Sequence, residues 1–352
     1  MFDIPFINKP LGWVMEAFSN LFGGSFAWAV FFFTLFINLI LIPLSIKSQK
    51  SAVQQARIKP KLDDLKKRFG NDKQKMAQET QKLYQQEGVT MSGGCLPMLL
   101  RLFIMLCIYN LILSPLTYMT GVNEKDLNTV ATAISQKFEN IKPKDDDDKA
   151  ATQEYNKLLK DLGWKEGGRF ELSLVGILHD EKKEEVLKTE LFTEKEFSEI
   201  EKAYNSIKAK DLEVGIDYKF ITEKINLTDS PDFDIDILNA WKPIWLMPIM
   251  AFVSQILSSL MSMAISKKNN PDAPSMKGMM LTMPLISLFI GFGFPGGVTF
   301  YWTCSSIVSG LIQVGVQYFY GPQKMLAKTR VKELAAQCDF EAKQLKKLGD
   351  EE

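Results

Sequence analysis

Residues 95–109 read CLPMLLRLFIMLCIY, so that one arginine, Arg101, interrupts a run of apolar residues. A charge at membrane depth costs at least about 2.5–3.5 kcal/mol on insertion scales, and residues of this kind usually face a water-filled cavity. A long basic side chain near the end of a span can instead extend its charge to the membrane surface. The stretch therefore predicts a membrane-spanning helix whose arginine either lines a wet cavity or reaches the nearby interface.

The same separation of apolar and charged residues runs through the whole chain. The chain has 352 residues, of which 46% are hydrophobic, and its formal net charge is zero. Five apolar stretches approach or exceed the roughly 17–25 residues that a helix needs to cross a membrane: 25–46, 95–116, 243–265, 279–295 and 298–320. A helix satisfies its own backbone hydrogen bonds in lipid. We therefore predict an all-α membrane protein with five transmembrane helices.

The charges between these stretches predict the orientation. Residues 47–88 carry 11 basic and 5 acidic side chains, whereas residues 117–240 carry 18 basic and 28 acidic ones. Short basic loops stay in the cytoplasm. The pattern places the segments 47–94, 266–278 and the tail 321–352 in the cytoplasm, and it places the N-terminus and the segment 117–242 outside.

The segments outside the spans have distinct patterns. Residues 1–24 predict an amphipathic helix on the outer membrane surface, with a disordered leader as the alternative, and we expect no cleaved signal peptide. Residues 47–68 and 73–87 predict a cytoplasmic helical hairpin. The segment 117–242 predicts a small, mostly helical insert, with helices at 150–162 and 194–210 and a strand at 170–177. The four cysteines lack metal-ligand spacing, and we expect them to be reduced.

Three of the apolar stretches carry polar residues at helical spacing, which places them on one face of each helix. The stripes are Thr34, Asn38 and Ser45; Gln255, Ser258, Ser259, Ser262 and Ser266; and Thr299, Thr303, Ser306, Gly310, Gln313 and Gln317. Such faces predict either a shared hydrated interior or tight polar packing between helices. At 1.5 Å per residue, Asn38 and Arg101 lie about 12 Å and about 9 Å from the inner boundary, so the arginine side chain is long enough for the two to meet.

Several separated motifs resemble the YidC/Oxa1/Alb3 family of membrane protein insertases, in its short bacterial form. They are PLGW at 10–13, IPL at 42–44, KPKL at 59–62, NDKQK at 71–75, KLY at 82–84, GV at 88–89, GGCLP at 93–97, LTDSP at 227–231, FPGG at 294–297 and YW at 301–302. The resemblance covers residues 5–120 and 225–322. It implies a bacterial cytoplasmic membrane protein that inserts nascent membrane proteins into lipid, without a nucleotide, a metal or any other cofactor.

The resemblance also implies a hydrophilic groove that is open to the cytoplasm and to lipid. The expected groove residues are Arg101, Asn38, Thr34, Gln255, Ser258, Ser262, Trp302, Thr303, Ser306 and Gln313. The hairpin is expected to meet substrates and partners through Lys59, Lys61, Lys66, Lys67 and Arg68. The resemblance implies action alone or together with the Sec translocon. A targeting receptor and the ribosome are further candidate partners, and no sequence-specific nucleic acid is expected.

The sequence departs from this family in two places. The groove arginine of the family usually stands in the first span, where this chain has Asn38, and Arg101 takes a position in the second span that is usually glutamine. We therefore expect that the charge has moved across the groove. The outside segment is also longer than in close relatives, and the family lends no function to residues 123–222.

Two other classes of function stay open at this point. A transporter would need a path to both sides, whereas most of these polar residues lie in the inner half of the spans. An envelope scaffold would be built on the segment 117–240. An enzyme is disfavoured, because the single histidine, His179, lies outside the spans and no Asp or Glu occurs in the last four spans.

Overall fold

The computed structural model describes most of the chain. It covers residues 5–70, 72–87, 96–143, 149–165, 169–220, 222–231, 241–269 and 277–321, with 327, 331 and 334–342. The chain forms two compact units. Unit 1 comprises Met1–Ile37, Phe103–Leu257 and Gly278–Val308, and unit 2 comprises Asn38–Leu102, Ser258–Lys277 and Ser309–Glu352.

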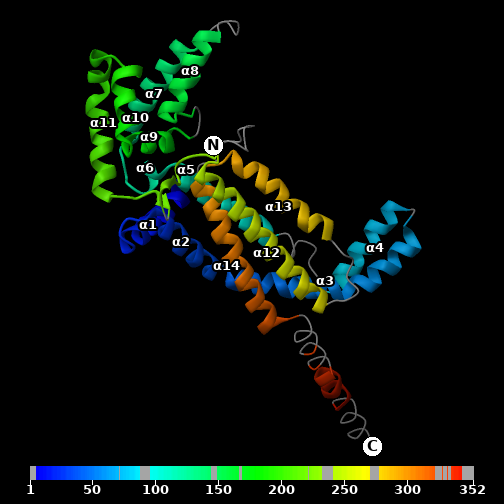
Figure 1. Ribbon diagram of the computed structural model, residues 1–352. Coiled ribbons are helices and arrows are strands. Elements are labelled where there is room, and N and C mark those ends of the chain that lie inside the picture. The colour runs from blue at the N-terminus through cyan, green and yellow to red at the C-terminus, as the bar shows by residue number, and fades with distance from the viewer. Residues whose placement is uncertain are drawn as a thin grey trace, which may run out of the picture. The chain divides into compact units, whose positions relative to one another are not determined.

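Helices account for nearly all of the described secondary structure (Figure 1). The N-terminal half has α1 (Pro5–Leu21), α2 (Phe26–Ile40), α3 (Ile42–Phe69), α4 (Lys73–Gln86), α5 (Leu96–Leu113) and α6 (Pro115–Tyr118). The C-terminal part has the 3-10 turn η3 (Pro243–Trp245), α12 (Leu246–Asn269), α13 (Lys277–Phe292) and α14 (Gly296–Tyr320). The predicted helical fold class is confirmed, with one short hairpin of two strands in addition.

The insert between α6 and η3 has its own order of elements. It contains α7 (Glu124–Ile141), α8 (Lys149–Leu162), α9 (Phe170–Leu178), α10 (Glu181–Val186), the π-helical turn η2 (Leu187–Leu191) and α11 (Glu194–Val214). The antiparallel strands β1 (Lys219–Phe220) and β2 (Thr222–Asn226) follow. Figure 1 shows α7 to α11 gathered in one helical group. The insert is therefore mostly helical, as predicted, and α8 and α11 confirm the two helices expected there.

Local signals explain where the insert helices begin and end. Asn123 and Asp180 cap α7 and α10 by accepting hydrogen bonds from backbone N–H groups of the first turn. Thr193 and Glu196 form a reciprocal capping box at the start of α11. The helix ends at Gly215, which adopts a left-handed conformation with φ of 63°. The chain itself thus specifies these helix ends.

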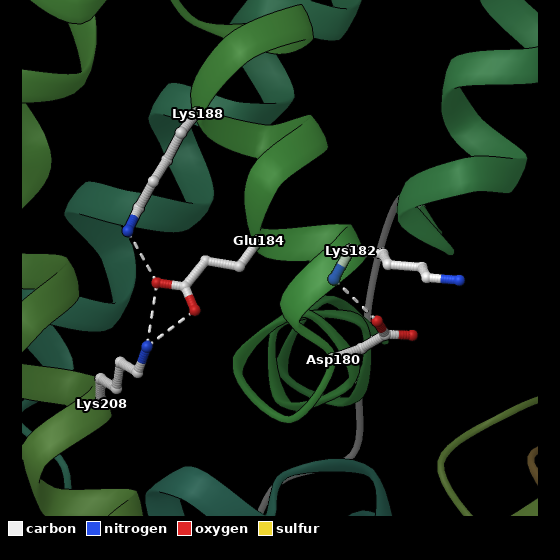
Figure 2. Close-up of polar contacts among 5 residues, drawn as sticks. All are labelled: Asp180, Lys182, Glu184, Lys188 and Lys208. Carbon is white, nitrogen blue, oxygen red and sulfur yellow. Dashed lines mark hydrogen bonds and ion pairs between the residues drawn. The ribbon is translucent and has the colours of Figure 1, made fainter.

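Ion pairs and one contact between a histidine and an aspartate join the insert helices. Glu184 of α10 accepts hydrogen bonds from the Nζ atoms of Lys188 at 2.7 Å and Lys208 of α11 at 2.7 and 2.9 Å, as Figure 2 shows. His179 Nε2 lies 2.6 Å from the carboxylate of Asp211, which is 1% exposed. Because these contacts connect α9, α10, η2 and α11, they hold the insert as one body around its apolar core.

The predicted strand at 170–177 is wrong, because these residues form α9. All residues from Glu171 to Leu178 are buried. A short, continuously apolar run has no clear period, so alternation cannot separate a buried strand from a buried helix. Here the acidic residue in the first turn, Glu171, suits a helix N-terminus.

The first predicted span, 25–46, is not one straight helix. It breaks at Leu41, where α2 meets α3 at an angle of 49°. Pro43 stands in the first turn of α3, a position that tolerates the missing backbone N–H. In a continuous helix, Pro43 would lack a backbone N–H donor and its ring would clash with the carbonyl group four residues earlier, so the break just ahead of it follows from the sequence.

Among the described residues, one helix is long and apolar enough to cross a membrane, Pro243–Ile265. The bent pair Phe26–Ile40 and Ile42–Ser51 makes a second if it counts as one span. The apolar helices Leu102–Leu113 and Thr282–Phe292 are shorter. The count of five spans and the sidedness of the loops therefore stay predictions.

Candidate functional site

The motifs that flank the last three apolar stretches meet in unit 1. The backbone N–H groups of Gly296 and Gly297 donate to the carbonyl oxygens of Asp229 at 2.8 Å and Leu227 at 2.7 Å. A Cβ added at Gly296 would lie 2.8 Å from Cδ1 of Ile244. The indole Nε1 of Trp245 donates to Pro231 O at 2.7 Å. The segments 227–231 and 294–297, far apart in sequence, therefore form one hydrogen-bonded cluster at the start of α12 and α14.

Within unit 1, three expected groove residues are buried or half-buried and are hydrogen-bonded. Gln255 of α12 accepts a hydrogen bond from Ser287 Oγ of α13 at 2.7 Å. Thr34 Oγ1 donates to Val30 O at 2.6 Å, and Thr303 Oγ1 donates to Thr299 O at 3.0 Å, both within their own helices. Such bonds satisfy a hydroxyl in an apolar surrounding. These residues therefore lie on inward faces, and one of them links two helices.

Unit 2 contains the remaining interhelical contacts of the groove residues. Asn38 is 8% exposed, and its Oδ1 accepts a hydrogen bond from Ser309 Oγ of α14 at 3.0 Å. Ser262 Oγ of α12 donates to Gln313 Oε1 of α14 at 3.1 Å. A Cβ at Gly310 would lie 2.9 Å from Ser258 Oγ, so α12 and α14 approach closely there. These contacts have the geometry of polar helix packing, the alternative that the stripes also predicted.

The other expected groove residues are placed less fully. Arg101 lies in α5, and its side chain is outside the described residues. Ser306 is half-buried on α14. Trp302 packs edge-on against Phe294, with ring centroids 5.5 Å apart. The expected meeting of Arg101 with Asn38 therefore stays a prediction.

The hairpin residues lie on α3 and α4, which pack together in unit 2. Lys61 forms an ion pair with Glu87 just after α4, which lowers the pKa of that carboxyl group through the hydrogen bond from the lysine. Lys66, Lys67 and Arg68 are exposed in the last turn of α3, and the side chain of Lys59 is outside the described residues. A hollow of about 250 Å³ between the helices is lined by residues of both signs.

Sequence reasoning missed three partners in these contacts. Ser309 and Ser287 donate to Asn38 and Gln255. Ser287 looks like an isolated serine in an apolar stretch, and Ser309 stands next to the predicted polar stripe of its helix but outside it. Glu171 accepts hydrogen bonds from Thr117 N–H at 2.9 Å and Thr117 Oγ1 at 2.8 Å. Burial raises the pKa of Glu171 to about 7. The hydrogen bonds from Thr117 act in the opposite direction and lower this pKa, but burial has the larger effect. The available signal was a carboxylate near the start of an apolar run.

The bond between Asn38 and Ser309 gives a measurable prediction. Replacing Ser309 with alanine is expected to destabilise the protein by about 0.6 kcal/mol and at most about 1.7 kcal/mol, the range measured for such bonds in membranes. A double-mutant cycle with Asn38→Ala isolates the coupling, with Ser305→Ala as a control on the same helix. A coupling energy of zero would show that the two side chains do not depend on each other.

Comparisons with known proteins agree with these motifs. The model of the family described as 60Kd inner membrane protein matches residues 17–138 and 216–323, together more than half of the chain. The residues between these two matched ranges, 139–215, fall in the insert. A membrane protein insertase YidC of Dechloromonas aromatica is 40% identical over 103 residues, which are 29% of this chain and 19% of the relative.

Two further relatives have the same description. Membrane protein insertase YidC 1 of Listeria monocytogenes is 39% identical over 111 residues, 30% of this chain and 39% of the relative. The insertase YidC of Pseudomonas fluorescens is 38% identical over 104 residues, 30% of this chain and 18% of the relative. The matched part thus spans less than half the length of each of these relatives. The extent of the family match nevertheless shows that this chain belongs to the 60Kd inner membrane protein (YidC/Oxa1) family.

Proposed function

We propose that this chain inserts nascent transmembrane segments into the bacterial cytoplasmic membrane, through a hydrophilic groove open to the cytoplasm. The observation that carries the proposal is the family match on both sides of the insert, which includes all of the apolar stretches predicted to span the membrane. The relatives named above are described as membrane protein insertases. Polar residues of α2, α12 and α14, from the buried Asn38 to the exposed Gln313, supply candidate groove walls.

The proposed mechanism rests on charge and on burial. A positive charge at Arg101, in a partly hydrated notch of low dielectric, attracts acidic residues in the substrate segment that must cross the membrane. Polar side chains such as Gln255 and Ser262 hydrate a short hydrophilic stretch part of the way across. The apolar helix of the substrate then moves into lipid, where the burial of its side chains drives the transfer.

The outward faces of two helices support such a route. On α12, Val253, Leu257 and Leu260 are 47–62% exposed and recur at steps of four and three. On α14, Ile307 and Leu311 are 46% and 62% exposed and lie four residues apart. Exposed apolar residues at helical spacing form a continuous stripe. Lipid and a departing apolar helix both fit these stripes.

The proposal includes a topology and partners. The N-terminus and the insert lie outside, and the hairpin and the tail lie in the cytoplasm. The exposed basic side chains at the end of α3 meet the ribosome, a targeting receptor or the emerging substrate, and the Sec translocon is a further partner. The groove works by binding and release, without a covalent step.

Complementation of an insertase-depleted bacterium tests the function. We expect rescue by the wild-type chain and by Arg101→Lys, and no rescue by Arg101→Ala, because the groove needs a positive charge and not a particular donor geometry. Reporter insertion into the membrane, measured by protease protection, gives the same ranking. Leu99→Ala, two residues away on the same helix, is the control and should rescue.

The outcomes separate the function from the role of the arginine. Rescue by the wild type and by both Arg101 variants would support the insertase function. It would also show that Arg101 reaches the interface instead of acting in a groove. Failure of a stably expressed wild-type chain would contradict the proposed function. The combination of Asn38→Arg with Arg101→Gln returns the charge to the usual position in the family, and its inactivity would refute the idea of a simple exchange.

A further inference from the structure

A pocket of about 270 Å³ lies within unit 1, and none of the expected groove residues is among its described lining residues. Its walls come from the end of α8, the start of α9, Lys183 of α10, the segment 228–230, Lys242 and Ile244 before α12, and Pro295 before α14. Typical small-molecule sites have volumes of about 300–1,000 Å³. The pocket therefore suits a small group.

The charges of the pocket are strongly one-sided. Of the described lining residues, five are cationic, and Asp229 is the one acidic residue. The cationic residues are Lys160, Lys165, Arg169, Lys183 and Lys242. The surrounding segment has the opposite balance, with 18 basic and 28 acidic residues between 117 and 240. The pocket thus concentrates positive charge within an acidic part of the chain, which creates an attractive potential for anions.

One cationic side chain, Arg169, is held in place by its neighbours. Its guanidinium donates from Nη1 to Gly293 O at 2.7 Å, and its Cζ lies 5.4 Å from the ring centroid of Phe294. A guanidinium has five N–H donors, so this bond uses a fraction of them. A planar group of this kind, fixed in orientation, matches the oxygens of a phosphate.

A second cationic side chain, Lys183, is positioned by two glycines. A Cβ at Gly163 would lie 3.3 Å from Lys183 Nζ, and a Cβ at Gly176 would lie 3.6 Å from it. The ammonium group therefore lies directly over backbone that carries no side chain. Its distance to Asp229 Oδ1 is 3.8 Å, so the single acid among the described lining residues lies at the far limit of an ion pair. Among the described lining residues, the five cationic side chains therefore outnumber the single acidic one.

The pocket adjoins the first turn of the apolar helix that is long enough to cross a membrane. That helix begins at Pro243, and Lys242 and Ile244 both line the pocket. Trp241 is 62% exposed, and its ring lies 5.9 Å from that of Trp245. Tryptophan is enriched at the membrane–water interface. A phosphate of a lipid headgroup at that level is therefore one candidate ligand of the pocket, and a phosphate from the solvent is the other.

We propose that this pocket binds a phosphate group, carried either by an anionic lipid headgroup or by a soluble phosphate. The proposal does not depend on the insertase function, because it rests on residues of the insert and of the segments next to it. Bound phosphate would connect α8, α9 and α10 with the start of α12. It would also reduce the repulsion among the cationic side chains of the described lining.

The test uses the full-length chain in a neutral detergent at fixed ionic strength. Short-chain phosphatidylglycerol is compared with phosphatidylcholine of the same chain length, and inorganic phosphate and glycerol phosphate are compared with chloride. Isothermal titration calorimetry measures the dissociation constant of each ligand, and the rise of the thermal midpoint with ligand concentration measures binding independently. We expect Lys242→Gln to weaken phosphate binding about tenfold, the factor that corresponds to about 1.4 kcal/mol, and Lys160→Gln to act in the same direction.

A matched control variant tests whether the pocket is the binding site, and the comparison of lipid with soluble ligands identifies the source of the phosphate. Lys202→Gln, an exposed lysine of α11 that does not line the pocket, should leave binding unchanged. Binding of phosphatidylglycerol alone identifies the lipid as the source, and equal binding of glycerol phosphate identifies a soluble ligand. Absence of binding in both arms, or equal loss in Lys202→Gln and Lys242→Gln, would overturn the proposal.

Discussion

Replacing Glu171 with glutamine is expected to stabilise the protein at pH 8 and to leave its stability at pH 4.5 nearly unchanged. The carboxyl group is buried at the start of α9, where Thr117 donates two hydrogen bonds to it. Burial disfavours the charged form and raises the pKa of Glu171 to about 7, from an ordinary value of 4.5. The folded protein therefore holds this proton more tightly than the unfolded chain does.

The direction of the pH effect follows from that difference. Stability from this group is fully present below about pH 4.5 and is lost as the pH rises through about 7, because the unfolded chain releases the proton first. This difference in pKa between the folded and unfolded chains lowers the free energy of unfolding by about 3 kcal/mol at pH 8, relative to low pH. Glutamine never ionises, and its amide can accept from the Thr117 N–H and donate to the Thr117 hydroxyl, so the variant avoids this loss.

The measurement is the thermal midpoint of both proteins in detergent across this pH range. We expect the two curves to meet near pH 4.5 and the variant to unfold several degrees higher at pH 8. Glu213→Gln is the control, because that carboxylate on α11 is 69% exposed. If Glu171→Gln is less stable than wild type at both pH values, the carboxylate is stabilising in its charged form and the prediction is wrong.

The sequence predicts single helices better than it predicts their contacts. The helix at Pro243–Ile265 agrees with the predicted span, because length and apolar composition suffice for that prediction. The pairing of Asn38 with Ser309 depends instead on the rotation and register of two helices that are 271 residues apart at this point. Spacing along one helix contains no information on which residue of another helix faces it.

One wrong prediction and one bend that was not predicted have a local physical cause. A strand is the wrong prediction for α9, because Phe170–Leu178 is buried around nearly its whole circumference and shows no polar face. The first predicted span, 25–46, stays a prediction but is bent, because its hydropathy continues through Leu41 whereas its helix is interrupted ahead of Pro43. The apolar composition of both stretches is compatible with the predicted elements. Whether each becomes a helix, a strand or a bent helix depends on tertiary packing or on backbone geometry.

Replacing Gly12 with alanine is expected to destabilise unit 1 by about 1–3 kcal/mol, the usual effect of overfilling a packed site. Gly12 lies in the middle of α1, and the added Cβ would stand 2.2 Å from the carbonyl oxygen of Tyr118 in α6. That oxygen belongs to the backbone, so a side-chain rotation cannot relieve the clash. The two helices must move apart, and Met15 on the same buried face of α1 would lose part of its packing.

Gly315→Ala is the matched control for this prediction. Gly315 also lies inside a helix, α14, but a Cβ there meets nothing within 4 Å. Alanine favours a helix over glycine by about 1 kcal/mol, so this control should be neutral or stabilising. The same helical gain opposes the clash at Gly12, so a lower thermal midpoint of Gly12→Ala can only come from the contact with Tyr118. A midpoint that rises equally in both variants would show that α1 does not pack against α6 as closely as the structure indicates.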